Sequence, residues 1–398
     1  MRLFDRTTPP RGFTLMIAAA TGSLAINVHL PALPGIAQHF QTGYAVVQLT
    51  LSIYLVSCGI LQLVIGPLSD RYGRRPVMLC CFMIFVLSAG ATIIAPSIEW
   101  VLFLRVLQAS AIAGQVLSRA VVRDTMETDA AASQIAYITM GMSLVPMIGP
   151  AIGGGLDELF GWQATFALMF AFGIFAFAIV WFDLGETNSK KSASFVAQIS
   201  NYPELLASRR FWGYTLAAAA TTGTFYGFLG TAPFVASQIL NMSPSGYGLY
   251  FALISVGYIA GNYCTTRFSR RYGINVMLLV GTGVALAGTL LSITLKAAGY
   301  FSPILFFGPV MLLFGHGLIL PNANSGIVSV RPHLAGTASG LGGAMQVGGG
   351  GTLSFFAATL VSVETGPMPL LLVMLGSTLV AVFAALFVLR ITRQEETV

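Results

Sequence analysis

The chain has 398 residues, of which 56% are hydrophobic and only 9% are charged. Soluble domains carry about 25% charged residues, so this composition excludes a soluble globular protein. The net charge of +6 does not indicate a nucleic-acid partner, because the basic residues are scattered along the chain rather than clustered.

Apart from Arg105, the charged residues lie between long apolar runs. A membrane-spanning helix needs about 20 apolar residues. The runs predict spans at 13–34, 45–67, 77–95, 99–121, 133–155, 163–183, 212–235, 246–267, 275–295, 302–323, 335–360 and 368–389. All four cysteines fall inside these runs, where neither a disulfide framework nor a metal site is expected. The sequence therefore predicts an all-α membrane protein with twelve transmembrane helices.

One long polar stretch divides the spans into two sets of six. It predicts an N-terminal six-helix half at 1–184, a cytoplasmic linker at 185–211 and a C-terminal six-helix half at 212–398. The halves also share a short repeat, because Arg-Tyr-Gly follows the second span at 71–73 and the eighth span at 271–273. Two parallel, pseudo-symmetric six-helix halves are typical of one large transporter architecture.

The positions of the basic residues predict the orientation in the membrane. If the N-terminus is cytoplasmic and successive loops alternate sides, 18 of the 20 Lys and Arg residues fall in cytoplasmic segments. The exceptions are Arg105, inside the fourth span, and Lys296. Positive residues concentrate on the cytoplasmic side of membrane proteins, so both termini are expected in the cytoplasm.

The loop between the second and third spans carries Gly66, Asp70, Arg71, Gly73 and Arg74. So short a connection needs glycine for close approach, and Asp70 can pair with nearby arginines at a helix end. The alternative interpretation is a solvated, positively charged loop. In the fifth span, Gly149-Pro150 and Gly153-Gly154 allow close helix approach and bending.

Arg105 lies in the middle of the fourth span, where an arginine costs on the order of 2.5–3.5 kcal/mol on insertion scales. Gln108 lies one turn further on the same helix face. Two interpretations remain open. Arg105 either lines a central cavity, where it orients substrate or repels a proton site, or it is a structural arginine bonded to backbone carbonyls.

These motifs resemble those of the major facilitator superfamily: its loop between spans two and three, its Arg-x-x-Gln motif in span four and its Gly-Pro-x-x-Gly-Gly antiporter motif. Further stretches resemble the Bcr/CflA group of drug:proton antiporters. They are Leu30-Pro31-Ala32-Leu33-Pro34, 119–124 (RAVVRD), Ala232-Pro233-Phe234, Pro321-Asn322-Ala323 and 335–339 (AGTAS). The resemblance covers nearly the whole chain.

The chain departs from this group at three positions. The group usually carries an aspartate four residues before the first proline of the Leu-Pro-x-Leu-Pro stretch, where this chain has Asn27. Ala109 replaces the glycine that normally follows the glutamine of the span-four motif, and Arg270 stands where the first half has Asp70. The first departure removes a natural proton carrier.

The resemblance implies roles for named residues. Asp70, Arg74 and an acid such as Asp124 are expected to form a charge cluster that stabilises one access state, although ordinary surface ion pairing is the alternative. Arg105 and His29 are the candidates for proton coupling. Other aromatic or polar residues expected near the cavity are Asn27, Tyr54, Gln108, Phe225, Tyr226, Asn262, Asn322 and Gln346.

The expected function is export of small amphipathic drugs or antibiotics by proton antiport with alternating access. Without an acid in the cavity, neutral, zwitterionic or anionic substrates are expected rather than lipophilic cations. The alternative is a major facilitator carrier for a natural metabolite or sugar, with weak or no proton coupling. An enzyme is disfavoured, because the spans hold no metal-binding His pair and no Ser-Lys or paired-Asp constellation.

The expected setting follows from the same resemblance. The chain is expected in a bacterial inner membrane as a multi-pass monomer, in contact with the lipid bilayer and a small-molecule substrate. No nucleic acid, metal or cofactor is expected, and the proton gradient is the expected energy source.

Overall fold

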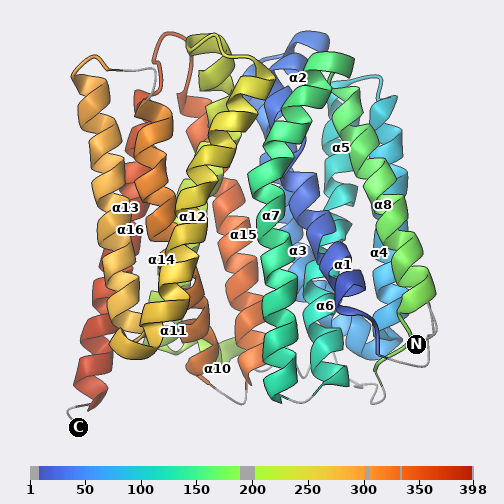
Figure 1. The fold of residues 1–398 in the computed structure, drawn as a ribbon, viewed down its shortest axis with the longest axis vertical. Coiled ribbons are helices and arrows are strands. Elements are labelled where there is room, and N and C mark those ends of the chain that lie inside the picture. The colour runs from blue at the N-terminus through green and yellow to red at the C-terminus, as the bar shows by residue number, and fades with distance from the viewer. Residues whose placement is uncertain (1–8, 127, 189–201, 301–303, 332–333, 397–398) are drawn as a thin grey trace. The chain divides into compact units, whose positions relative to one another are not determined.

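A computed structural model describes residues 9–126, 128–188, 202–300, 304–331 and 334–396, and Figure 1 shows its helices. Within these residues the secondary structure is helical and contains no strand. All twelve predicted spans fall on helices in this part of the chain. The predicted fold class, an all-α membrane protein with twelve transmembrane helices, is therefore confirmed.

The first six spans contain two interruptions. Their helices are α1 (Gly12–Asn27), η1 (Leu30–Ala32), α2 (Leu33–His39), α3 (Tyr44–Tyr72), α4 (Arg74–Ile93), α5 (Ile98–Gln108), η2 (Ala109–Ala111), α6 (Ile112–Thr125), α7 (Thr128–Phe160) and α8 (Gln163–Asp183). The first span breaks after Asn27, where Pro31 and Pro34 each fall in the first turn of a new short helix. Proline is tolerated there because its missing N–H would have no partner in the helix.

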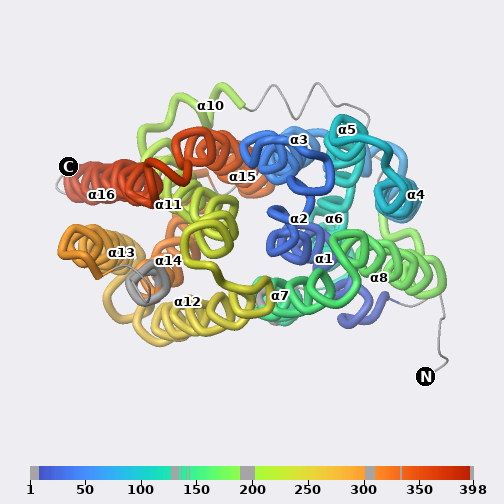
Figure 2. Tube along the Cα trace, turned by 90° about the horizontal axis from the view of Figure 1, so that it is seen from above, coloured from blue at the N-terminus to red at the C-terminus, as the bar shows by residue number. Residues whose placement is uncertain are grey.

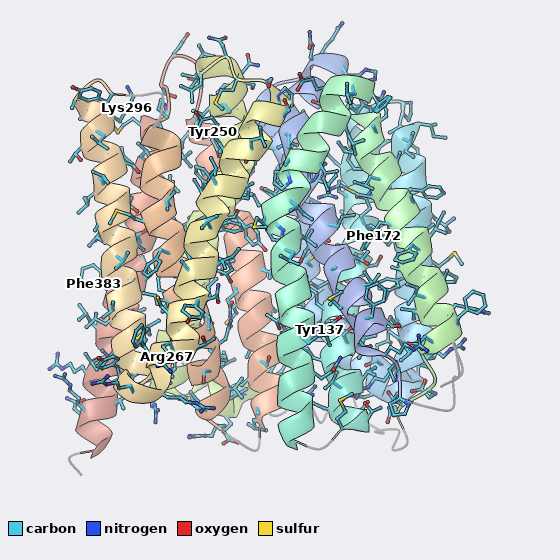
Figure 3. The ribbon with its side chains drawn as sticks, viewed as in Figure 1. Tyr137, Phe172, Tyr250, Arg267, Lys296 and Phe383 are labelled. Carbon is cyan, nitrogen blue, oxygen red and sulfur yellow. The ribbon has the colours of Figure 1, made fainter. Side chains whose placement is uncertain are left out.

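The second six spans follow a short helix. Their helices are α10 (Tyr202–Leu206), α11 (Arg209–Phe234), η3 (Val235–Ile239), α12 (Pro244–Tyr272), α13 (Ile274–Ala297), α14 (Ile304–Ser329), α15 (Ala335–Leu360) and α16 (Met368–Glu396). Arg267 and Lys296 lie at opposite ends of this set of helices (Figure 3). This placement agrees with their assignment to opposite sides of the membrane.

Eight helical segments in the described residues are long and apolar enough to cross a membrane. They are Gly12–His39, Tyr44–Tyr72, Arg74–Ile93, Ile98–Thr125, Tyr137–Phe160, Gln163–Asp183, Ile274–Ala297 and Met368–Gln394. The other four predicted spans, α11, α12, α14 and α15, are 26 to 29 residues long. Glycine, serine and threonine lower the hydropathy of α11, α12 and α15, and such small residues let membrane helices approach closely.

The chain divides into two compact units. The first contains residues 1–198 and 243–248, and the second contains 199–242 and 249–398. The predicted linker at 185–211 is described only at 185–188 and 202–211. Its first described residues pack on the first unit, as the site below shows.

In the first unit, α1 packs against α6, α7 and α8 (Figure 2). Glycines make two of these contacts possible. A Cβ atom added at Gly114 of α6 would clash with the backbone of Ala18, and one added at Gly153 of α7 would clash with the carbonyl of Val28. The backbones therefore approach more closely than any side chain allows.

In the second unit, α11 packs against α14, α15 and α16, and α13 packs against α14 and α16. Small residues again lie at the contacts. A Cβ added at Gly317 of α14 would lie 2.5 Å from the carbonyl oxygen of Tyr258, and one added at Gly315 would lie 2.6 Å from that of Gly281. The glycines of this half therefore serve close helix packing.

Candidate functional site

Arg105 lies in the last turn of α5 and is completely buried. Its Nε donates to the carbonyl oxygen of Thr50 at 2.9 Å, and Nη1 donates to Oε1 of Gln108 at 2.8 Å. Its guanidinium carbon lies 4.3 Å from the centroid of the Tyr54 ring, within cation–π range. The bond to Thr50 is the backbone contact expected of a structural arginine.

Gln108 connects this arginine to a further helix. Its Nε2 donates to Oγ1 of Thr92 at 2.8 Å, and Oε1 accepts from Arg105. The hydroxyl of Tyr54 donates to the carbonyl of Gly22 at 3.1 Å. Side chains and carbonyls from α1, α3, α4 and α5 therefore converge on one point inside the first unit.

His29 contacts the same group. It lies between α1 and η1, is completely buried, and places Nε2 3.5 Å from Nη2 of Arg105. Its ring centroid lies 5.9 Å from that of Phe166. The sequence names His29 and Arg105 as separate candidates and does not predict their contact. We call His29, Tyr54, Thr92, Arg105 and Gln108 the buried arginine cluster.

Among the residues that the structure describes, Arg105 forms no ion pair with a carboxylate. A buried cation is costly unless it is paired or well hydrogen-bonded. Two neutral acceptors and an aromatic face hold it here. The cluster therefore carries one positive charge that neutral groups alone compensate.

Asn27 is buried at the end of α1, and its Nδ2 donates to the carbonyl of Ser23 at 2.7 Å. Its Oδ1 is buried and has no hydrogen-bond partner among the described residues. A Cβ added at Gly149 of α7 would lie 3.2 Å from the Cβ of Asn27. The residue that replaces the aspartate of related proteins therefore lies at the contact between α1 and α7.

The antiporter motif forms the α7 side of this contact. α7 is one continuous helix that includes Pro150. Gly149 faces Asn27 and Gly153 faces Val28, whereas Gly154 is buried against the backbone of Pro244. The expected close approach is observed, and for Gly149 and Gly153 the partner is the end of α1.

The candidates in the second unit bond separately within their own helices or to single neighbours. Asn262 donates to Tyr258 O at 2.9 Å, and Gln346 donates to Oδ1 of Asn324 at 2.7 Å. Asn322 is buried and accepts from Oγ of Ser269 at 2.8 Å. The rings of Phe225 and Tyr226 lie 5.5 Å apart. These contacts do not join the five residues into one cluster.

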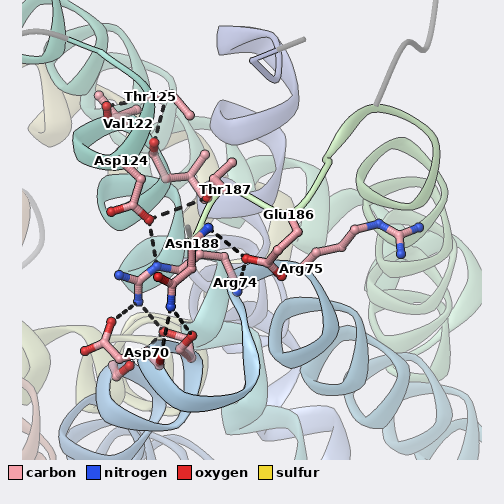
Figure 4. A network of polar contacts seen from close by, with 12 residues as sticks. Asp70, Arg74, Arg75, Val122, Asp124, Thr125, Glu186, Thr187 and Asn188 are labelled. Atoms are coloured by element: carbon pink, nitrogen blue, oxygen red, sulfur yellow. Dashed lines mark hydrogen bonds and ion pairs between the residues drawn. The ribbon is translucent and has the colours of Figure 1, made fainter. Parts of the chain in front are cut away.

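A network of charged side chains connects α3, α4 and α6 (Figure 4). Nη1 of Arg74 lies 2.5 Å from Oδ1 of Asp70 and donates to Oγ of Ser69 at 2.6 Å. Nε of Arg74 lies 2.9 Å from Oδ2 of Asp124. The structure thus brings together Asp70, Arg74 and Asp124, the three residues that the resemblance implies.

The segment after α8 adds a fourth charge, which the sequence prediction does not include. Oε1 of Glu186 accepts the backbone N–H of Arg74 at 2.9 Å, and Oε2 accepts that of Arg75 at 3.3 Å. Nδ2 of Asn188 donates to the carbonyl of Asp70 at 2.8 Å. These bonds satisfy terminal backbone groups of α4 and α3, which have no partner within their own helices. In the sequence, the signal for this contact is a carboxylate, Glu186, that follows closely after the sixth span.

Arg75 also holds this segment. Its Nε donates to the carbonyl of Leu184 at 2.8 Å, and its guanidinium carbon lies 5.1 Å from the centroid of the Trp181 ring. We call Asp70, Arg74, Arg75, Asp124, Glu186 and Asn188 the loop network.

The expectation that Gly66 lies in the loop between the two spans and serves close approach there is wrong. α3 continues through Gly66 to Tyr72, and a Cβ added at Gly66 would meet open space. The turn is Gly73 alone, with φ +106°, a conformation that favours glycine. Arg71 lies outside the loop network, with its guanidinium carbon 5.3 Å from the centroid of the Tyr72 ring.

The second unit repeats the turn and has arginines beside it, but within the described residues no ion pair to a carboxylate joins them. Gly273 has φ +81°, and the guanidinium of Arg271 lies 5.4 Å from the Tyr272 ring. Neutral bonds, from Ser269 to Asn322 and from Tyr214 to Asn275, lie near this turn. Within the described residues, the charged network is therefore a property of the first half.

Two six-span units, an arginine buried within a span and a charged turn between two spans define a polytopic membrane transport protein. The chain belongs to the Major Facilitator Superfamily, whose family model matches residues 15–354. Its resemblance to Bcr/CflA-type drug transporters is also confirmed.

Two bacterial relatives and one solved structure illustrate the similarity. The chloramphenicol resistance protein of Pseudomonas aeruginosa is 32% identical, over 83% of this chain and 80% of its own length. Multidrug resistance protein D of Escherichia coli K12 is 27% identical, over 92% of this chain and 93% of its own. The human organic anion transporter MFSD10 has a TM-score of 0.72 and 20% identity, covering 94% of this chain and 98% of that one, and supports the fold alone.

Proposed function

We propose that this chain is a secondary active transporter that exports small amphipathic drugs or antibiotics by alternating access. Its membership of the Major Facilitator Superfamily supports a transporter rather than an enzyme. The names of its bacterial relatives, a chloramphenicol resistance protein and a multidrug resistance protein, support drug-type substrates.

The buried arginine cluster is the observation that carries the proposal. Charged residues within membrane helices are rare and costly, and they mark substrate or proton pathways in addition to pairing with backbone carbonyls. Neutral acceptors orient Arg105, and no carboxylate among the described residues neutralises it. We therefore propose that the transporter prefers neutral, zwitterionic or anionic compounds over lipophilic cations.

The proton gradient is the proposed energy source. Asn27 cannot titrate, so it cannot be the proton carrier. His29 can titrate and contacts Arg105, which supports these two residues as the coupling pair. A proton on His29 would add a second positive charge 3.5 Å from the guanidinium. Proton binding and the position of Arg105 would thereby be linked by repulsion.

The loop network is the proposed conformational latch. It joins α3, α4 and α6 to the segment after α8, and its bonds can hold these helices in one access state.

The location proposed for the chain is a bacterial inner membrane, with both termini in the cytoplasm. The chain is proposed to act as a monomer, with no cofactor and no nucleic-acid partner.

A carrier for a natural metabolite or sugar, with weak or no proton coupling, is the second candidate. Asn27, in place of an aspartate, favours it, because the usual titratable group is missing.

Transport by the purified chain in reconstituted vesicles distinguishes the two functions. The assay measures accumulation of chemically varied compounds under an imposed proton gradient, with and without a protonophore. Accumulation that the protonophore abolishes supports the antiporter, whereas unaffected, gradient-independent flux supports the second candidate. Preferred transport of ethidium-like cations would contradict the proposed role of Arg105.

The variant Asn27→Asp tests where coupling resides. It restores a carboxyl group at the contact between α1 and α7, so we expect stronger proton coupling than in the original chain. Proton movement per substrate is measured in the same vesicles. Unchanged coupling would exclude this position as the site of the missing carrier.

A further inference from the structure

The second unit has a hollow of about 700 Å³ at the end where α11 begins and α16 ends. Arg209 and Arg210 of α11 line it together with Arg331, which follows α14. A second hollow of about 520 Å³, lined by Arg390 and Arg393 of α16, shares Gln394 with the first. Arginines from three separate elements therefore converge on one place.

The arginines at the start of α11 break a local rule of helix stability. They occupy its first two positions, and the first turn contains no acidic residue. The N-terminus of a helix carries partial positive charge, so cations there are unfavourable and anions are favourable. Arg331 also forms an ion pair with Glu204, with 2.9 Å between Nε and Oε1. The hollow thus combines a helix N-terminus with two adjacent arginines, an arrangement that a bound anion would stabilise.

The depth of the hollow in the membrane is indicated by its neighbours. Trp212 follows the two arginines, is 37% exposed and donates from Nε1 to the carbonyl of Leu206 at 2.7 Å. Tryptophan with a polar handle is typical of the headgroup level of a bilayer. Leu216, one turn further along α11, is 45% exposed. The hollow therefore lies where headgroups lie, with apolar surface next to it.

On α16, apolar residues again lie next to the arginines. Leu386 and Leu389 line the second hollow together with the arginines that follow them in the next turn. Phe383 lies on the outer face of α16 (Figure 3) and is 67% exposed. An acyl chain can pack along this face while its phosphate reaches the arginines.

We propose that the two hollows bind the phosphate headgroup of an anionic phospholipid, with its acyl chains on the outer faces of α11 and α16. Basic pockets between membrane helices are known to bind such headgroups. Arginine suits this role because its planar fork can donate two parallel hydrogen bonds to a phosphate. The proposal concerns a lipid site and does not depend on which substrate is transported.

Lipid binding by the purified full-length protein tests the proposal, with phosphatidylglycerol and phosphatidylethanolamine as probes. The test variant is Arg209→Gln/Arg210→Gln. The control is Arg270→Gln/Arg271→Gln, which removes the same charge from an exposed pair outside both hollows. Native mass spectrometry counts the lipid retained by each protein as its concentration rises.

We expect the original chain to retain phosphatidylglycerol in preference to phosphatidylethanolamine. Each basic residue at an anionic lipid contributes roughly fivefold in affinity, so the test variant should bind phosphatidylglycerol about thirtyfold more weakly. The control should bind as the original chain does. If the test variant does not fold, Arg331→Gln alone should weaken binding roughly fivefold.

Three results would overturn the proposal. One is equal retention of the two lipids by the original chain. Another is equal weakening in the test variant and the control, which would indicate diffuse charge. The third is displacement of bound phosphatidylglycerol by inorganic phosphate, which would indicate a site for the free ion rather than the lipid.

Discussion

Arg105 illustrates how one residue can unite several helices. Its side chain bonds to Thr50 and Gln108 and covers Tyr54, while His29 approaches from the end of α1. Together these contacts hold the guanidinium in one orientation.

Arg105→Ala should abolish transport while leaving membrane expression intact, because it removes both the charge and its bonds. Arg105→Lys keeps the charge but loses the planar fork that reaches Thr50 and Gln108 together. A hydrogen bond to a charged group contributes about 1.5–3 kcal/mol, so transport by the Lys variant should fall at least about tenfold. Vesicle transport at matched protein levels measures both. Full transport in the Ala variant would exclude any role in the cycle.

At the scale of elements, the close contact between α7 and the end of α1 depends on the absence of a side chain at Gly153. A Cβ at Gly153 would meet the carbonyl oxygen of Val28, whereas one at Gly155 of the same helix would meet nothing within 4 Å. The two positions form a natural pair for substitution.

Gly153→Ala should separate α7 from α1 and lower the thermal unfolding midpoint by several degrees, because overpacking costs about 1–3 kcal/mol. Gly155→Ala is the matched control, and it should leave the midpoint unchanged or raise it, since alanine favours the helix. Thermal unfolding in detergent measures both midpoints. Equal effects of the two substitutions would show that helix propensity, not close approach, decides the result.

Glu186 acts on an element from outside it, because it accepts the first backbone N–H groups of α4. Loss of a helix cap costs about 0.5–2 kcal/mol. Glu186→Ala should therefore lower the unfolding midpoint of the protein. Glu204→Ala is the control, since its exposed ion pair with Arg331 contributes about 0–1 kcal/mol. A larger loss in the control would contradict the capping role.

At the scale of the whole molecule, charge distribution predicts how the chain is inserted. Lys296 lies at the end of the second unit opposite Arg267, and the basic residues predict that its end faces away from the cytoplasm. Alkaline phosphatase needs disulfides, which form outside the bacterial cytoplasm. Alkaline phosphatase should therefore be active when it is fused after Gly299 and inactive when it is fused after Val398. The reverse pattern would overturn the predicted orientation.

The linear sequence was sufficient for the fold because a bilayer imposes simple requirements. Spans must be long and apolar, so Arg105 stands out by itself, and the charged loops locate the segment boundaries. The pair of Asp70 and Arg74 could be predicted because the two residues are only four positions apart, on either side of one turn.

Only the tertiary structure decided which distant groups meet. His29 reaches Arg105 because the first span breaks after Asn27, and Glu186 reaches α4 because α8 ends beside it. Gly73, rather than Gly66, makes the turn because α3 remains helical through its proline. Hydropathy and spacing describe one helix at a time, whereas these contacts depend on where separate helices end in three dimensions.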